Sequence, residues 1–432
     1  MPHPPLTSTL AYLTADVPGT GGTIKCRPED FHVEELPLYP PAGQGEHVYL
    51  GIEKRERTTT DVVRRLAKLF NVRRSDIGYA GLKDKQAVTR QTFSVYLPKT
   101  GTETDLLPRL EFTGLKLLWS ARHANKLRRG HLAGNRFVLF IRQVAPPTVV
   151  RAKRVLDTLV AQGVPNFIGE QRFGHRQNNH LLGKLLLLEQ WQEFLDTLLG
   201  RPDAYDSPPV AQARRFYEQH DYAQALELWP RWMHHDRQAL DLLRQGKPAR
   251  AAVLGIDAGQ REFLLNAMQS AVFNQVLDQR LRAGTFDRLQ AGDLAMKHEN
   301  GSLFAVDAAI AEAENTSTGR AALKQVSPTG PMWGQHMMQP ADAVLATEIA
   351  ALNALGINVA QLGQAQSSGQ VEGNRRSLRA LVVNPDISAG TDDAGPFLRL
   401  AFDLPPGSYA TTILREIIKP EQTGSKLEEE DA

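Results

Sequence analysis

The chain has 432 residues, 42% of them hydrophobic, and its 50 Lys and Arg against 48 Asp and Glu give a net charge of +2. This length can bury large cores and predicts two domains. A single cysteine excludes a disulfide framework and any multi-cysteine zinc site, and no apolar run is long enough to cross a bilayer. Residues 1–17 lack the basic and apolar parts of a targeting segment, so we expect a cytoplasmic protein.

The first 150 residues are predicted to be mainly β-structure. They contain runs of β-branched and aromatic residues bounded by turn formers, a pattern typical of strands. Between two of these runs, apolar residues recur at helical spacing from Thr60 to Phe70. The strands are expected at 47–52, 92–97 and 135–141, and a second helix at 149–160.

From Val164 onward the pattern becomes mainly helical, and strand character returns near the end of the chain. Helices are expected at 181–199, 211–229, 262–282 and 409–418, with β-structure at 293–306 and 397–404 and an extra helical lobe at 201–250. Strand-rich ends around a helical middle predict a discontinuous domain with an insertion, with boundaries near residues 163 and 345.

The charges are unevenly distributed along the chain. Between Phe112 and Leu156 there are ten Lys and Arg but no Asp or Glu, and residues 54–99 add twelve Lys and Arg against four acids. A single basic cluster is most simply a solvated surface. Two such stretches in one half of a nearly neutral protein favour a partner with a phosphate backbone.

The turn from Gly78 to Gln91 holds one carboxylate, Asp84, between Lys83 and Lys85. An Asp in a turn is more often a capping residue than a catalytic one. Here the flanking lysines favour the ionised carboxylate, which suits a nucleophile or base rather than an acid. Asp84 is therefore the first candidate for chemistry.

Several other residues suit contact with a nucleic acid base. Lys25 and Phe31 flank a turn, Asn135 and Phe137 end the acid-free segment, and Tyr409 precedes the last expected helix. An Asn amide can pair with a base edge and an aromatic ring can stack on a base, although each residue alone is more often structural.

Three further features of the sequence have weaker signals for a functional site. The string 164–174, with two aromatic residues and two glycines, suits an RNA-binding surface or a packed interdomain hinge equally well. His234-His235-Asp236 lacks the spacing of a metal site, so no metal is expected. Cys26 is expected to be packed as a small hydrophobic residue.

Taken in chain order, these strings closely resemble the TruD family of tRNA pseudouridine synthases. The matching elements are Lys25 to Phe31, Ala80 to Thr89, Ala121 to His123, Gly134 to Phe137, 164–174, Phe273 to Gln275 and Pro406 to Thr411. The resemblance implies an α+β fold with a mixed, mainly antiparallel pseudouridine-synthase sheet and flanking helices. It also implies an inserted α/β TRUD-type domain at 164–345, with 1–163 and 346–432 forming the catalytic domain.

The same resemblance implies isomerisation of uridine to pseudouridine at position 13 of tRNA. In this family the residue that matches Asp84 is the nucleophile. The family positions that contact or line the substrate site match Phe31, Asn135, Tyr409, Phe137 and Lys25. Two features depart from the family pattern: Tyr409 stands where Phe is common, and residues 201–250 form a longer stretch than a compact member has.

The reaction that this resemblance implies involves no net redox change, so no cofactor and no metal are expected. We expect tRNA as the partner, no membrane association and a monomeric protein. Asp84 could attack C1′ or C6, or remove the C2′ proton to form a glycal, and the sequence does not distinguish these routes. A non-catalytic RNA-binding protein remains an alternative, whereas a carboxylate hydrolase is disfavoured because no second acid lies in a comparable motif.

Overall fold

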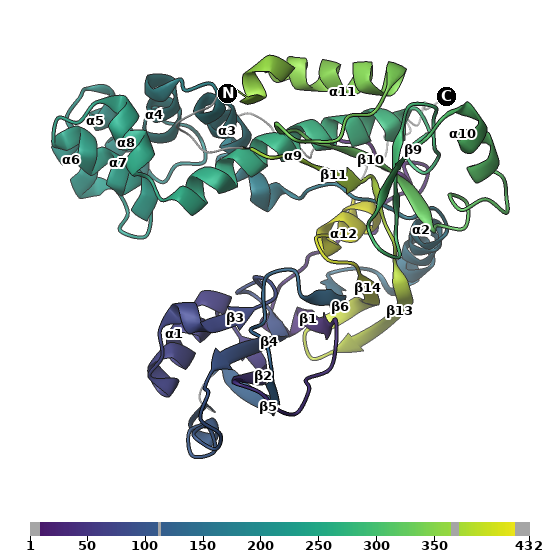
Figure 1. Ribbon diagram of the computed structural model, residues 1–432, viewed down its shortest axis with the longest axis horizontal. Helices are drawn as coiled ribbons and strands as arrows, with labels where there is room; N and C mark the ends of the chain where they lie inside the picture. Colours follow the sequence, from purple (N-terminus) through teal and green to yellow (C-terminus); the bar gives the residue numbers. More distant parts are fainter. Residues whose placement is uncertain (1–8, 111–113, 364–370, 420–432) are drawn as a thin grey trace, which may run out of the picture. The chain divides into compact units, whose positions relative to one another are not determined.

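The computed structural model describes residues 9–110, 114–363 and 371–419, which form two compact units (Figure 1). We call them the sheet unit, the described part of Thr14–Val164 and Ala380–Ala432, and the helical unit, the described part of Met1–Leu13 and Pro165–Arg379. The chain therefore leaves the sheet unit once and returns to it once.

The return to the sheet unit lies at residue 380, whereas a boundary near 345 was expected. The difference arises because α11 (Asp342–Ala354) packs on α9 (Ala258–Arg282), and β11 (Asn374–Ser377) pairs with β10 (Val326–Met332). These contacts keep residues 346–363 and 371–379 in the helical unit. The first boundary, between residues 164 and 165, lies next to the expected one.

Among the described residues, eight strands form the sheet of the sheet unit, in the order β13-β14-β6-β1-β4-β2-β5 with β3 paired to β4. β1 and β4 pair in parallel, and the other neighbours pair antiparallel. The strands are β1 (Phe31–Pro37), β2 (His47–Arg55), β3 (Ile77–Tyr79), β4 (Val88–Tyr96), β5 (Leu115–His123), β6 (Leu132–Arg142), β13 (Val383–Asp392) and β14 (Gly395–Leu404). The expectation of a mixed, mainly antiparallel sheet is confirmed.

Helix α1 (Thr59–Phe70) covers part of one face of this sheet, and its start is fixed by a capping box. Thr58 Oγ1 accepts from the Asp61 backbone N–H at 3.0 Å, while the Asp61 side chain accepts from the Thr58 N–H at 3.1 Å. The helix belongs to the same buried apolar cluster as Leu50 and Phe93 of the sheet. The other helices of this unit are α2 (Val149–Gln162) and α12 (Ala410–Ile418).

The helical unit is built around α9, the long helix that contacts α3, α11 and β10. The apolar residues of α9 predicted to be inside, from Leu264 to Leu277, are buried. A small antiparallel sheet in the order β11-β10-β8-β9 lies in the same unit. The remaining elements are α3 (Asn179–Leu187), α4 (Trp191–Leu199), α5 (Pro208–Glu218), α6 (Tyr222–Leu228), α7 (His234–Arg244), α8 (Ala249–Gly255), α10 (Ala308–Glu314), β8 (Leu294–Lys297) and β9 (Leu303–Ala305), and short β7 (Val164–Pro165) and β12 (Arg379–Ala380) lie where the chain passes between units.

Two of the expected helices are interrupted. The expected helix at 181–199 divides into α3 and α4, and the one at 211–229 divides into α5 and α6. Glu189 and His220, in the interruptions, have φ of 52° and 61°, which a continuing right-handed helix does not allow. Among residues 9–110, 114–363 and 371–419, no helix is both long and apolar enough to span a membrane.

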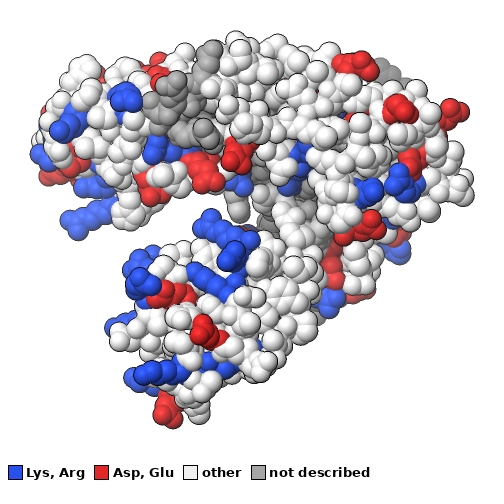
Figure 2. Space-filling view, in the orientation of Figure 1, with Lys and Arg blue, Asp and Glu red and all other residues white. Residues whose placement is uncertain are grey.

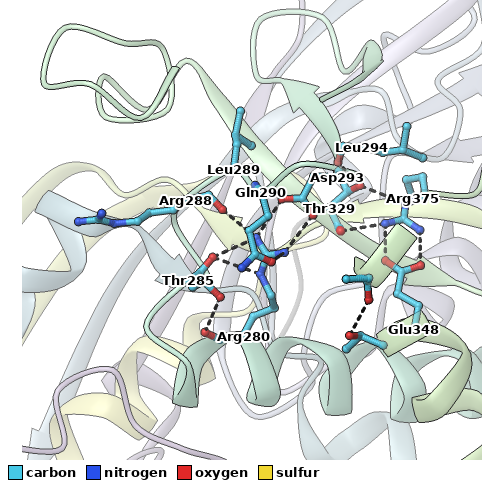
Figure 3. Close-up of polar contacts among 12 residues, drawn as sticks. Arg280, Thr285, Arg288, Leu289, Gln290, Asp293, Leu294, Thr329, Glu348 and Arg375 are labelled. Carbon is cyan, nitrogen blue, oxygen red and sulfur yellow. Dashed lines mark hydrogen bonds and ion pairs between the residues drawn. The ribbon is translucent and has the colours of Figure 1, made fainter. Parts of the chain in front are cut away.

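Two buried ion pairs join the elements of the helical unit (Figure 3). The Arg375 guanidinium donates to both oxygens of Glu348 at 2.7 Å, and both side chains are only 1% exposed. Arg375 also donates to the hydroxyl of Thr329 at 3.0 Å, while Arg280 pairs with both oxygens of Asp293 at 2.9 and 3.0 Å. The first pair thus links β11, α11 and β10.

We expect Glu348→Ala to lower the free energy of unfolding of the helical unit by about 3–5 kcal/mol, because it leaves the Arg375 charge buried without its partner. The double variant Glu348→Leu/Arg375→Met, which removes both charges, should recover most of this loss. Urea unfolding of the three proteins tests the prediction, and a loss below about 1 kcal/mol in the single variant would contradict it.

Candidate active site

The loop between β3 and β4 carries Asp84 and is anchored at two points. The Gln91 side-chain amide donates to the Gly81 carbonyl at 3.2 Å, and the Lys83 backbone N–H donates to Thr59 Oγ1 at 3.0 Å. Thr59 in turn donates to the Gln91 side-chain oxygen at 3.0 Å. The first turn of α1 and strand β4 therefore hold the loop jointly.

Lys54 also holds this loop, and its side chain is fully buried. Its ammonium donates to the carbonyl oxygens of Arg57 at 2.7 Å, Asp84 at 2.8 Å and Lys83 at 3.4 Å. Burial lowers the pKa of Lys54 to about 8, partly opposed by the negative charge of Asp84. The ammonium thus fixes the backbone on both sides of the Lys83–Asp84 peptide bond.

Lys54 was not identified from the sequence, although its position in β2 gives a signal. Val48, Leu50 and Ile52 alternate along β2 and belong to one buried cluster. Lys54 continues this alternation, which places a lysine at an inward-facing position of a strand. A buried lysine requires hydrogen-bond acceptors, and the loop carbonyls supply them.

The cation next to the Asp84 carboxylate is Lys25, whose ammonium lies 2.7 Å from Oδ2. Lys25 has φ of 58°, in the left-handed region that few non-glycine residues occupy, and its ammonium lies 4.3 Å from the centre of the Phe31 ring. Among the described residues no group donates to Asp84 Oδ1, and the Asp84 side chain is 37% exposed. One carboxylate oxygen is therefore held and the other is available.

The flanking lysines form no ion pair with Asp84 among the described residues. The Lys83 ammonium donates to Asn135 Oδ1 at 2.6 Å and lies 3.3 Å from Glu35 Oε2, while Lys85 is exposed. Burial raises the pKa of Glu35, and the nearby Lys83 charge opposes this shift. Contacts from distant strands thus decide which lysine reaches which carboxylate.

The aromatic residues Phe31 and Phe137 contact each other edge to face, with ring centres 6.5 Å apart. They lie on the paired strands β1 and β6 and are only 3% and 7% exposed, and Phe402 of β14 packs against Phe137 at 5.6 Å. These rings form a buried apolar floor rather than an exposed platform. Tyr409 is the residue directly before α12 and is partly exposed.

The turn before Phe31 is anchored by a buried arginine. Arg142 donates to Asp30 Oδ1 at 2.9 and 2.7 Å and to both oxygens of Asp392 at 2.7 and 2.9 Å. These bonds lower the pKa of Asp392 to about 2. The tip of the β13–β14 hairpin therefore supports the turn that presents Lys25 and Phe31.

Five of the ten basic residues in the acid-free segment form ion pairs with acids outside it. Lys and Arg gather on the surface over α1 and the neighbouring strands of the sheet unit (Figure 2). The ion pairs of the segment are Arg122–Glu103, Arg136–Asp403, Arg142–Asp30, Lys153–Asp157 and Arg154–Asp16. The composition of this segment therefore overstates its need for a bound anion.

Two of the other strings have structural environments that bear on their expected roles. In 164–174, Phe167 and Phe173 are buried, and the side chain of Asn274 bonds both the N–H and the carbonyl of Ile168, which favours the packed alternative. Cys26 is exposed, with Sγ 3.1 Å from Thr23 Oγ1, so the expectation that it is packed is wrong.

We expect the wild-type protein to gain stability relative to Lys54→Met as the pH rises from about 8 to 10.5. Below pH 8, Lys54 is charged in both the folded and unfolded states, so the cost of burying the charge is constant. Between the folded pKa of about 8 and the ordinary value of 10.5, the unfolded state binds more protons, and the cost is relieved by up to about 3 kcal/mol. Urea unfolding across this pH range measures the difference, and parallel pH curves for the two proteins would contradict it.

Comparisons with known proteins agree with the motifs found in the sequence. A family model described as tRNA pseudouridine synthase D (TruD) matches residues 8–417. A tRNA pseudouridine synthase D of Geobacter sulfurreducens is 42% identical over 415 residues, which cover 96% of this chain and 98% of the relative. One of Anaeromyxobacter dehalogenans is 34% identical over 422 residues, which cover 98% of this chain and 99% of the relative.

A solved structure gives the same result. The crystal structure of the putative tRNA pseudouridine synthase D from Methanosarcina mazei matches with a TM-score of 0.78 at 26% identity. The match covers 95% of this chain and 96% of that chain. Because these matches extend over nearly the whole length, the chain belongs to the TruD family of tRNA pseudouridine synthases.

Proposed function

We propose that this protein converts uridine to pseudouridine at position 13 of tRNA, with Asp84 as the nucleophile. The observation that carries the proposal is the state of the Asp84 carboxylate. Lys25 holds one oxygen at 2.7 Å, the other oxygen accepts from no described residue, and Lys54 fixes the backbone of the loop. A nucleophile needs this combination of charge, accessibility and fixed position.

The reaction breaks the N1–C1′ bond and forms a bond from C5 to C1′. The C5 proton is lost, N1 gains a proton, and no electrons are exchanged with another molecule. A uridine stacked within an RNA helix must first leave the stack, which costs about a few kcal/mol. Attack by Asp84 on C1′ or C6, and removal of the C2′ proton, all require an ionised carboxylate, and Lys25 places a cation 2.7 Å from it.

The remaining site residues have roles that follow from their positions. We assign Phe31 and Phe137 to the apolar wall against which the base lies, and Tyr409 to a stacking contact with the RNA. Asn135 is assigned to the base edge, and Lys25 to holding the Asp84 carboxylate in position. In this proposal the sheet unit is the catalytic domain and the helical unit is the inserted TRUD domain.

Binding without catalysis is the alternative, and the Asp84 loop favours the enzyme. A carboxylate that faces RNA phosphates weakens binding, so a protein that only binds RNA gains nothing from it. The buried Lys54 is used to hold the backbone of the loop that carries this carboxylate, at a cost in desolvation.

We expect Asp84→Asn to lower the rate of pseudouridine formation by at least about a thousand-fold while leaving tRNA affinity within a few-fold, because the amide is neither nucleophile nor base. Asp76→Asn, at an exposed ion pair with Arg73, is the matched control and should keep the wild-type rate. Purified protein is incubated with unmodified tRNA transcripts, pseudouridine is mapped by nucleotide, and binding is measured separately.

Four outcomes are informative in this experiment. Normal product formation by Asp84→Asn would refute the role of Asp84, and tight binding by the wild type without product would support the binding alternative. A transcript with cytidine in place of uridine 13 should give no product. If the protein instead forms pseudouridine at another uridine, only the assignment to position 13 is refuted, and the role of Asp84 is kept.

A further inference from the structure

The two ends of the Asn135 carboxamide have different surroundings. Its oxygen accepts a hydrogen bond of 2.6 Å from the Lys83 ammonium. Its nitrogen donates to no group among residues 9–110, 114–363 and 371–419, and the residue is partly exposed. The N–H group of Asn135 is therefore available to a ligand, whereas its carbonyl is occupied.

The position of Lys83 is itself fixed. Its side chain is 6% exposed, and its ammonium pairs with Glu35, which is 3% exposed. The second oxygen of Glu35 accepts from the Thr92 backbone N–H at 3.2 Å, which ties this carboxylate to strand β4. Rotation of the Lys83 ammonium away from Asn135 would leave a buried charge with one partner fewer.

The chemistry of lysine determines which way the carboxamide faces. An ammonium has three donors and no acceptor, so it can bond the amide oxygen but not the amide N–H₂. A flipped amide would place two donor groups against each other at 2.6 Å. The orientation of Asn135 therefore follows from the identity of its neighbour and does not depend on distinguishing oxygen from nitrogen by position.

We propose that Lys83 is a positioning residue, which holds Asn135 so that its N–H₂ group, and not its carbonyl, faces the uracil and donates to O2 or O4. This inference rests on the proposed function. Uracil offers two acceptors, O2 and O4, and one donor at N3, whereas cytosine has an amino group in place of O4. A fixed donor at O4 would exclude cytosine, because two donors would face each other, whereas a fixed donor at O2 would orient the base without excluding cytosine.

This arrangement gives neighbouring residues two separate tasks. Lys83 orients the group that reads the base, and Asp84 supplies the nucleophile. Lys54 bonds the carbonyls of both residues at 3.4 and 2.8 Å. Because one buried ammonium holds both peptide groups, the reading group and the attacking group keep a fixed separation.

The first test is Asn135→Asp, which keeps an oxygen towards Lys83 and replaces the N–H₂ with a second acceptor. We expect kcat/KM for pseudouridine formation to fall about 100-fold, because the donor to uracil is lost and two acceptors face each other. If the Asn135 carbonyl instead accepted from uracil N3–H, the carboxylate would replace it well. Activity within a few-fold of wild type would therefore overturn the proposal.

The second test uses sulfur-substituted substrates, which report on the hydrogen bond and not on the stability of the protein. Sulfur is a weak acceptor of hydrogen bonds. Of two tRNAs that carry 2-thiouridine or 4-thiouridine at the target, we therefore expect wild-type protein to convert one at least about tenfold more slowly than the tRNA with uridine. The slower substrate identifies the oxygen that is read. Lys83→Met, whose Asn135 amide can rotate, should lose this preference, and Lys85→Met, which removes an exposed lysine next to Asp84, should keep it.

The outcomes separate this inference from the function on which it rests. If wild-type protein forms no pseudouridine in any tRNA, both fail. If it forms pseudouridine but treats all three substrates alike, or if Lys83→Met keeps the wild-type preference, this inference alone fails. Circular dichroism and thermal unfolding of each variant exclude loss of folding as the cause of a lower rate.

Discussion

The buried ammonium of Lys54 is the constraint on which the site depends. A lysine without a counter-carboxylate in direct contact is costly inside a protein, and here carbonyl oxygens of three loop residues replace its water shell. The carbonyls of Lys83 and Asp84 can reach the ammonium only if the loop between β3 and β4 follows one path. The path in turn sets the directions in which the side chains of Lys83 and Asp84 leave the backbone.

The charges around this ammonium are arranged so that each has a defined partner. Lys25 faces Asp84 and Lys83 faces Glu35. In each pair the lysine and the carboxylate come from segments that are far apart in the sequence. Three cations therefore lie near two carboxylates, a local excess of positive charge beside a site proposed to receive RNA. This excess favours an anionic substrate.

The sequence revealed Asp84, the main strands and the aromatic residues, because each carries a local signal. Val48, Leu50 and Ile52 alternate in a strand, and the apolar spacing of α1 is typical of a helix. The sequence did not reveal that Lys25, 59 residues away, is the partner of Asp84, because that pairing depends on how β1 and β4 lie in the sheet. The interruptions at Glu189 and His220 were also missed, since neither residue is a typical helix breaker.

The discontinuous sheet unit has a consequence for the order in which the chain folds during synthesis. Strand β14, which covers one side of β6, and helix α12, whose Glu416 accepts from Thr14 at 2.7 and 3.1 Å, come from the last part of the chain. Until the ribosome has made residues 395–418, β6 presents an open edge with unpaired N–H and C=O groups. A growing chain therefore carries Lys25 and Asp84 long before it can bury Phe137, and it needs protection from aggregation during that interval.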